Sequence, residues 1–234
     1  MTSTKSQNGS VFFYILIAII LLAGLSYAVN NNSRVGTAII TEQQARVVSS
    51  QVLEQGEAMA LAVQKLLLRG FDETEISFEN SVVAGYGLAS CATDDCKVFN
   101  DAGGALNWFE PPEGSNSDED WVYSGDLPIA DNGNNNVYDI TMILPNVNDS
   151  VCRQINFELN ITSSINDPIP TATDATLGAT KLSTANPINA ASEVINGGII
   201  DGNTAICVEI VNSSGELTAV PNNRFFFVQT LYAG

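Results

Sequence analysis

The amino-acid sequence predicts an α+β protein. A long N-terminal helix, transmembrane in its lower half and amphipathic in its upper half, packs on an antiparallel β-sheet that carries long loops and two disulfides. Three observations lead to this prediction. Residues 11–29 form an apolar run without charge or proline, residues 35–69 repeat apolar side chains at helical spacing, and the chain after Gly70 changes to short β-like runs between polar turns.

The apolar run reads VFFYILIAIILLAGLSYAV, and Gly24 is its single glycine. As a helix it would be about 28 Å long, close to the hydrocarbon thickness of a bilayer. The backbone of a segment in lipid must satisfy its own hydrogen bonds, so a helix is the expected form. We therefore expect a leader or cytoplasmic segment over residues 1–9 and a transmembrane helix over residues 10–29.

A secretory signal is the alternative interpretation of this run. Ser26, Tyr27 and Ala28 would then supply a small-x-small cleavage site. The run is longer than the usual signal core, and Lys5 is the only positive side chain before it. These two features favour a retained anchor.

Residues 30–70 predict an amphipathic helix that continues from the membrane. Its apolar side chains recur at spacings of three, four or seven, with polar residues between them: Ala45, Val48, Val52, Met59, Val63 and Leu66. Gly56 lies on the same side, where a missing side chain permits close approach of another element. Lys65 and Arg69 suit the negative end of the helix dipole, and Gly70 is a natural C-cap. We expect the apolar side to pack on the protein's own domain, with packing against copies of itself as the alternative.

Residues 71–234 predict an extracytoplasmic, disulfide-bonded, β-rich domain. We expect Asp149 or Ser150 to be the N-cap of a short helix that carries Cys152 on its apolar side. Residues 162–198 are rich in Thr, Ser, Ala, Asn and Pro and predict a long exposed loop. The expected strands are residues 75–78, 121–123, 138–144, 205–211, 216–220 and 224–232, with turns at 131–133 and 212–215.

The net charge of −17 is concentrated in this second part. Residues 1–70 have a net charge of +2 and residues 71–234 a net charge of −19. An acidic domain repels phosphate backbones, so a nucleic-acid partner is not expected. The interpretation we favour is a solvated surface that keeps an exported domain soluble, and cation binding or docking to a basic partner is the alternative.

All four cysteines follow the apolar run: Cys91, Cys96, Cys152 and Cys207. A zinc site without histidine needs four thiolates, usually in two close pairs, and only one pair is close here. Two disulfides in an oxidising compartment fit better. Three pairings are possible, and we favour Cys91–Cys96 with Cys152–Cys207. The disulfides and the acidic domain together place the C-terminal part in the periplasm or outside the cell.

This layout resembles a type IV pilin or pseudopilin. The resemblance is carried by a short leader ending in Gly9, a hydrophobic span from Ser10, Val11 and Phe12, an amphipathic continuation, a sheet and a C-terminal disulfide. It implies cleavage between Gly9 and Ser10, methylation of the new N-terminus and assembly of subunits through the apolar helix. Tyr14 stands at the fifth mature position, where the family usually has glutamate and where minor, tip-type pseudopilins can lack it.

The pieces FFYILIAIILLAGLSYAV, CKVFNDAGG and LPNVNDSVCRQIN also resemble an uncharacterised group of bacterial single-anchor envelope proteins. This second resemblance implies a location and no activity. The expected location is the bacterial inner membrane, with a single pass and an extracytoplasmic C-terminal domain.

The sequence does not predict an enzyme or a cofactor. It contains no histidine, which excludes Ser-His-Asp and Cys-His nucleophile pairs. Adjacent acids occur at Asp94 and Asp95 and at residues 118–120, but acids in Gly/Ser/Asn loops are usually solvated charge. Calcium is the one ion to consider. Its candidate ligands are Asp118, Glu119 and Asp120, or Asp131 with Asn132, Asn134 and Asn135.

The function expected from these patterns is structural. The chain would be a pilin-like or minor pseudopilin-like subunit of a cell-envelope filament or secretion assembly. Its partners would be the inner membrane and other proteins or copies of itself, contacted through the N-terminal helix. The alternative is a membrane-tethered or secreted, non-catalytic binding module whose loop 162–198 meets a ligand.

Overall fold

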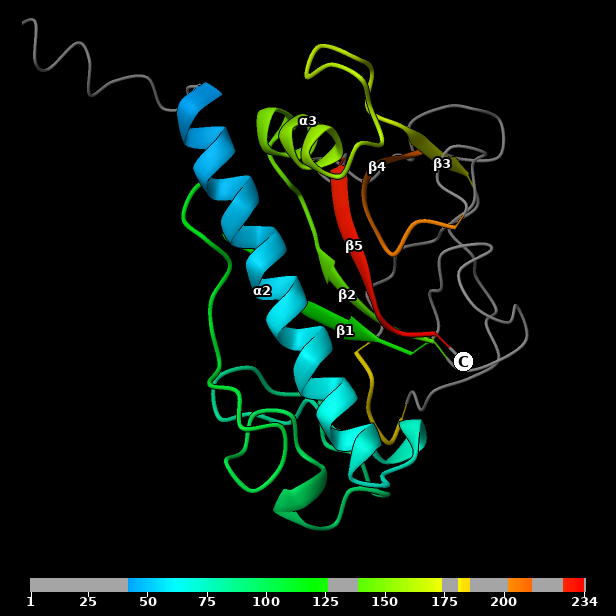
Figure 1. The fold of residues 1–234 in the computed structure, drawn as a ribbon. Helices are drawn as coiled ribbons and strands as arrows, with labels where there is room; N and C mark the ends of the chain where they lie inside the picture. The colour runs from blue at the N-terminus through cyan, green and yellow to red at the C-terminus, as the bar shows by residue number, and fades with distance from the viewer. Residues whose placement is uncertain (1–41, 126–138, 174–180, 186–201, 212–224, 234) are drawn as a thin grey trace, which may run out of the picture. The chain divides into compact units, whose positions relative to one another are not determined.

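The computed structural model describes residues 42–125, 139–173, 181–185, 202–211 and 225–233 (Figure 1). The leader, the apolar run, the turns at 131–133 and 212–215 and the expected strand 216–220 lie outside these residues. The helices are α2 (Glu42–Leu68) and α3 (Asp149–Glu158). The strands are β1 (Val122–Ser124), β2 (Ile140–Leu144), β3 (Thr171–Thr173), β4 (Ala205–Val211) and β5 (Phe225–Tyr232).

The five strands form one mixed sheet in the order β1-β2-β5-β4-β3. Three neighbouring pairs are antiparallel, and β3 runs parallel to β4. The expectation of an antiparallel sheet is therefore wrong at this edge. It failed because β3 is a three-residue edge strand inside a Thr-rich stretch, where Ala172 alone is described as buried. Such a short strand leaves no alternating pattern in the sequence.

Both helices cover the same face of the sheet. The helix α2 contacts β5, α3 contacts β4 and β5, and the two helices contact each other (Figure 1). A sheet that buries one face under helices is the usual α+β arrangement. The α+β fold class is confirmed.

The amphipathic pattern of α2 is confirmed over residues 42–68. The six apolar residues that define the pattern are all buried, together with Ser49, Gly56 and Ala62. Gly56 lies against β5, since a Cβ atom there would fall 1.8 Å from Oε1 of Gln229. The expected close approach at this glycine is therefore present. Residues 35–41 of the expected helix lie outside the described part of the chain.

The end of α2 is a Schellman motif, which satisfies carbonyls that the helix leaves open. The amide of Gly70 donates to the Leu67 carbonyl at 2.9 Å, and the amide of Phe71 donates to the Leu66 carbonyl at 3.3 Å. Gly70 has a φ of +95°, a conformation that side chains disfavour. The expected C-cap is confirmed.

The expected strand at residues 75–78 is wrong. Asp72 and Glu75 form a reciprocal capping box around a 3₁₀ turn at Glu73–Glu75. Ser77 then makes only an isolated parallel bridge with Lys97. Ile76 and Phe78 alternate as in a strand, but both side chains are fully buried from a backbone that is irregular.

The remaining elements match their expected positions closely. The strands β1, β2, β4 and β5 begin and end within two residues of the predicted bounds. The N-cap of α3 is Asn148, not Asp149 or Ser150, and its side chain donates to the Gly114 carbonyl at 2.6 Å instead of capping the helix.

The core includes a cluster of buried aromatic side chains next to the sheet. Phe78 stacks on Tyr123 with ring centroids 4.4 Å apart, and Tyr86 meets Tyr123 edge-on at 5.5 Å. The Tyr86 hydroxyl donates to the Trp121 carbonyl at 3.1 Å and accepts from the Tyr123 amide at 3.3 Å. Irregular residues 76–86 are thereby joined to β1.

No helix within the described ranges has both the length and the apolar character needed to cross a membrane. The apolar run at residues 11–29 lies outside those ranges.

Candidate functional site

Both expected disulfides are formed, Cys91–Cys96 and Cys152–Cys207. Among the described residues no cysteine is left free. The favoured pairing is therefore confirmed. The two crosslinks occupy different parts of the domain and hold different kinds of structure.

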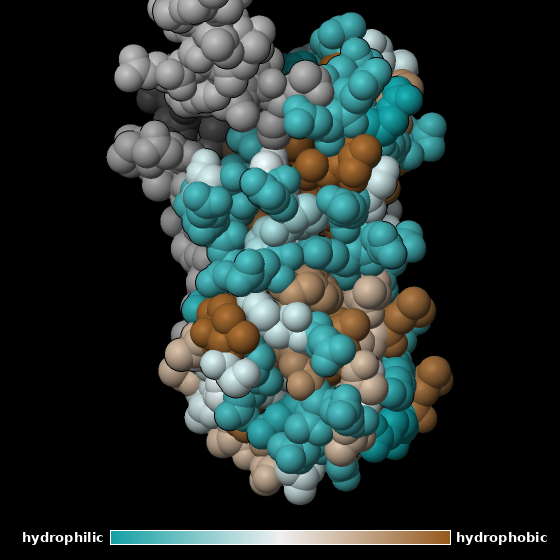
Figure 2. Space-filling model, turned by 90° about the vertical axis from the view of Figure 1, so that its left-hand side faces the viewer, coloured by the Kyte–Doolittle hydropathy of each residue, from teal (hydrophilic) through white to brown (hydrophobic). Residues whose placement is uncertain are grey.

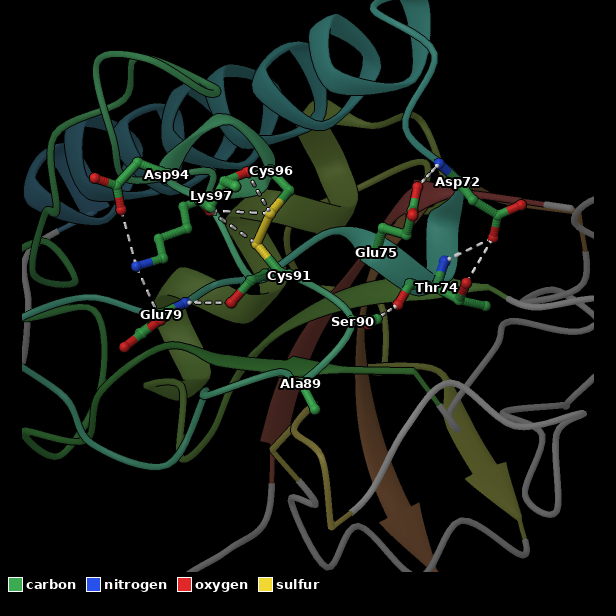
Figure 3. The surroundings of a disulfide bond; sticks show 12 residues. Asp72, Thr74, Glu75, Glu79, Ala89, Ser90, Cys91, Asp94, Cys96 and Lys97 are labelled. Carbon is green, nitrogen blue, oxygen red and sulfur yellow. Dashed lines mark hydrogen bonds and ion pairs between the residues drawn. A yellow bond between two sulfur atoms is a disulfide. The ribbon is translucent and has the colours of Figure 1, made fainter.

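The Cys91–Cys96 disulfide closes a small acidic loop below the end of α2 (Figure 3). The ammonium group of Lys97 pairs with Glu79 at 3.2 Å and with Asp94 at 3.0 Å. These two hydrogen bonds, with Asp94 the stronger, raise the pKa of Lys97. Asp94 is thus an ion-pair partner and Asp95 is exposed, an arrangement that holds the loop rather than forming an acid–base pair.

The same loop is attached to the capped turn after α2. The Ser90 hydroxyl donates to the Thr74 carbonyl at 2.6 Å, and Thr74 donates its amide and hydroxyl to the Asp72 carboxylate (Figure 3). The hydrogen bonds from Thr74 lower the pKa of Asp72. Phe71 packs on the disulfide from the other side. Polar and apolar contacts together hold the cysteine loop to the α2 terminus.

The Cys152–Cys207 disulfide joins α3 to β4. Beside it Asn156, which is fully buried, makes two reciprocal hydrogen bonds to the backbone of Cys207. Its amide donates to the Cys207 carbonyl at 2.7 Å, and its carbonyl accepts from the Cys207 amide at 2.9 Å. One side chain therefore completes the backbone hydrogen bonding of β4 next to the crosslink. Sequence patterns did not single out Asn156, because an asparagine within a short helix carries no signal of a distant partner.

The basic side chains in the last turns of α2 bind a glycine-containing loop. Lys65 donates to the Gly104 carbonyl at 3.2 Å, and Arg69 donates to the carbonyls of Ala102 and Gly103. A Cβ atom at Gly103 would lie 2.1 Å from the Lys97 carbonyl oxygen. The glycines at 103 and 104 allow backbone to pack on backbone here.

The acidic residues 118–120 line a cavity of about 250 Å³ together with residues 110–114 and Asn116. Glu119 is already engaged, because its carboxylate accepts a hydrogen bond from the buried amide of Asn146. No three acidic or cysteine side chains in the part of the chain that the structure describes are arranged to hold a metal ion. The first candidate calcium cluster is therefore not assembled as a metal site, and the second, at Asp131–Asn135, lies outside the described residues.

The outward face of α2 carries exposed apolar side chains. Val47, Leu61 and Leu68 are 60%, 65% and 90% exposed. They are separated by fourteen and seven residues, and seven residues are close to two turns, so the three lie along one side of the helix. Glu54 occupies the remaining position of this series and is also exposed. We call Val47, Leu61 and Leu68 the α2 stripe.

Figure 2 shows the side of the molecule on which α2 lies. Apolar residues appear there as separate patches within a predominantly hydrophilic surface. Leu61 and Leu68 contribute little to folding from such exposed positions, which makes them candidates for contact with another helix.

Comparison with known proteins gave no match: no family model, no curated protein and no solved structure is similar to this chain.

Proposed function

We propose that this protein is a pilin-like or minor pseudopilin-like structural subunit of a bacterial cell-envelope filament or secretion assembly. Residues 10–29 anchor it in the inner membrane, and the disulfide-bonded domain lies outside the cytoplasm. Subunits or partners pack along the N-terminal helix. The protein acts by assembly and not by catalysis.

The observation that carries this proposal is the α2 stripe. The helix buries one side on its own sheet and leaves Leu61 and Leu68 exposed on another. A helix that packs only within its own domain needs no apolar side chains on its solvent face. Seventeen residues of sequence separate the stripe from a segment whose composition is that of a membrane span.

Two further observations support the location. Both disulfides require an oxidising compartment if they are to persist. The excess of acidic residues after residue 70 suits a domain that must stay soluble away from the membrane.

The mass of the mature protein extracted from membranes tests the proposal. We expect a chain that begins at Ser10, carries one added methyl group and retains both disulfides. A chain that begins near Val29 would instead indicate a secreted module, and a chain that keeps Met1 would indicate a plain anchor. Either result would overturn the pilin-like assignment.

Substitution of the stripe tests the assembly surface. Leu61→Glu and Leu68→Glu should each change the free energy of unfolding by no more than a few tenths of a kcal/mol, because exposed positions contribute little to stability. The same variants should reduce the fraction of the protein that crosslinks into oligomers in intact membranes. Val82→Glu is the matched control, since Val82 is 60% exposed but lies outside α2. Equal crosslinking of all three variants and the native chain would rule out the stripe.

A binding module is the second candidate, and the cavity at residues 110–120 is the observation that favours it. Its lining includes Glu110, Glu113 and Asp118, so its ligand would be cationic. Titration of the folded domain with polyamines or basic peptides would test this candidate. Saturable binding that Glu113→Gln weakens would support it.

A further inference from the structure

The segment that ends α3 contains the triplet Asn160-Ile161-Thr162, which fits the N-x-[ST] pattern of N-glycosylation acceptors. The chain holds five such triplets, beginning at Asn8, Asn31, Asn148, Asn160 and Asn212. Only those at Asn148 and Asn160 lie within the described residues. The triplet at Asn160 differs from the other four in having an acidic residue, Glu158, two positions before the asparagine.

The acceptor asparagine is presented at the surface. Asn160 is exposed and has a φ of +58°, and its backbone closes a Schellman motif at the end of α3. Its amide donates to the Phe157 carbonyl at 3.1 Å, and the amide of Ile161 donates to the Asn156 carbonyl at 2.9 Å. The side-chain nitrogen lies 3.5 Å from the Glu158 carbonyl, at the outer limit of a hydrogen bond. A group attached to this nitrogen would project into solvent.

The helix end accounts for an asparagine at position 160 but not for a threonine at position 162. Asparagine is a common residue at a left-handed C-cap. In contrast, the hydroxyl of Thr162 is buried without a hydrogen-bond partner among the described residues. An unsatisfied buried hydroxyl is destabilising, and valine would fill the same space without that cost. No contact among the described residues therefore explains why a hydroxyl stands at position 162.

The triplet at Asn148 provides the contrast. The amide of Asn148 donates to the Gly114 carbonyl at 2.6 Å, and the Gly114 loop in turn packs against the start of α3. The backbone amide of Asn148 also donates to the Ser115 carbonyl at 2.9 Å. Modification of this side chain would break the contact between the loop and the helix. Asn160 is free of such a constraint.

We propose that Asn160 is the acceptor of an N-linked glycan, transferred to it from a polyprenyl-diphosphate-linked oligosaccharide. The inference rests on the proposed function for its location, since the donor must meet the domain on the outer side of the membrane. The bond from Nδ2 of Asn160 to C1 of the first sugar forms, and the bond from C1 to the diphosphate oxygen breaks. The electron pair leaves with the diphosphate, the amide nitrogen loses one proton, and no oxidant or reductant is needed.

The roles of the neighbouring residues follow from their chemistry. Thr162 supplies the hydroxyl that defines the acceptor triplet. In the folded domain the carboxylate of Glu158 accepts hydrogen bonds from the Ser49 hydroxyl and the Gln154 amide, both at 2.9 Å, so it meets a basic group of the transferase before these contacts form. The Thr162 hydroxyl is buried in the folded domain, so transfer occurs before the turn at residues 160–162 closes or while it is locally open. The glycan then remains on an exposed side chain and is compatible with the closed fold.

Tryptic peptides of this chain allow glycosylation of Asn160 to be measured directly. Trypsin cuts after Arg153 and after Lys181, and no lysine or arginine lies between them. The peptide 154–181 therefore contains Asn160 as its single acceptor triplet and no cysteine. Asn148 falls in the preceding peptide, which begins after Lys97. For protein isolated from the cells that naturally make it, we expect a glycan mass increment on peptide 154–181 and none on the Asn148 peptide.

Three variants separate the acceptor role from a structural one. Asn160→Gln and Thr162→Val should each abolish the increment, while Thr162→Ser should retain it. Thr162→Val should also fold at least as stably as the native chain, since the hydroxyl it removes has no hydrogen bond. Loss of the glycan in a variant that folds normally is a result that a merely structural threonine cannot give.

Two negative outcomes are distinguishable. An unmodified peptide 154–181 from a protein that begins at Ser10 and has both disulfides would overturn the glycan and leave the proposed function intact. An unmodified peptide from a cytosolic protein with free thiols would overturn both. A glycan that persists in Thr162→Val would also contradict the proposal, because the hydroxyl would then be unnecessary.

Discussion

The two disulfides should contribute unequally to stability, and the difference can be calculated from their loops. A crosslink restricts the unfolded chain more when the loop it closes is longer. Cys91 and Cys96 are 5 residues apart, whereas Cys152 and Cys207 are 55 residues apart. On the loop-closure relation the short crosslink contributes about 2 kcal/mol and the long one about 4 kcal/mol.

The variants Cys91→Ala/Cys96→Ala and Cys152→Ala/Cys207→Ala compare the two crosslinks directly. All four cysteines are at least 94% buried, so the cost of truncating the side chains is similar in both pairs and largely cancels in the comparison. The long-loop variant should therefore be less stable than the short-loop variant by about 2 kcal/mol.

Urea unfolding followed by the fluorescence of the fully buried Trp121 measures both free energies. Each double variant lacks a thiol, so exchange with the remaining disulfide cannot confuse the result. Equal losses of stability, or a larger loss on removal of Cys91–Cys96, would refute the loop-length reasoning. They would show instead that the packing of Phe71 and the ion pairs around Lys97 depend on the short crosslink.

Three further predictions concern the interior. Asn156→Ala removes the side chain that bonds to both backbone groups of Cys207, and it should lower the free energy of unfolding by about 2–4 kcal/mol. In the same urea titration, Asn107→Ala at an exposed position should change the free energy of unfolding by less than about 0.5 kcal/mol. Gly104→Ala places a Cβ atom 2.5 Å from the Val98 carbonyl oxygen and should reduce the melting temperature, while Gly87→Ala, with open space around its Cβ position, should not. Burial raises the pKa of Tyr86 to about 12 and that of Tyr123 well above its ordinary value, so the folded state holds protons that the unfolded chain releases above about pH 10. The contribution of these two tyrosines to stability is therefore fully present below pH 10 and is lost as the pH rises toward 12. Tyr123→Phe should reduce this loss of stability at alkaline pH. If the stability of the variant depends on pH as that of the native chain does, the raised pKa of Tyr123 is contradicted.

Local chemistry explains the features that the sequence predicted well. The side of α2 that packs on the sheet is defined by apolar residues at helical spacing, and its end at Gly70 is defined by a backbone conformation that favours glycine. The strands β4 and β5 are apolar enough to be found within one residue of their observed bounds. Of the three possible disulfide pairings, the favoured one is observed, and it joins Cys91 to the cysteine nearest to it in the sequence.

Features that depend on distant partners were not predictable in the same way. Residues 76–78 look like a strand because they are buried, but the capping box at Asp72 turns the chain so that Ser77 makes a single bridge. The edge strand β3 forms by pairing with the side of β4 that β5 does not occupy. The sequence also does not show that Asn156 bonds to the backbone of Cys207, or that the Thr162 hydroxyl has no hydrogen-bond partner among the residues that the structure describes.

The sequence alone therefore determined the helix face, its cap, the pairing of the cysteines and the strongly apolar strands, because each depends on spacing or on residues close together in the chain. The tertiary structure decided the parallel edge, the irregular course of residues 71–104, and the use of Glu119 as a hydrogen-bond acceptor of Asn146 instead of a metal ligand. Each of these is set by contacts between segments far apart in the chain, whose energies no local pattern of residues records.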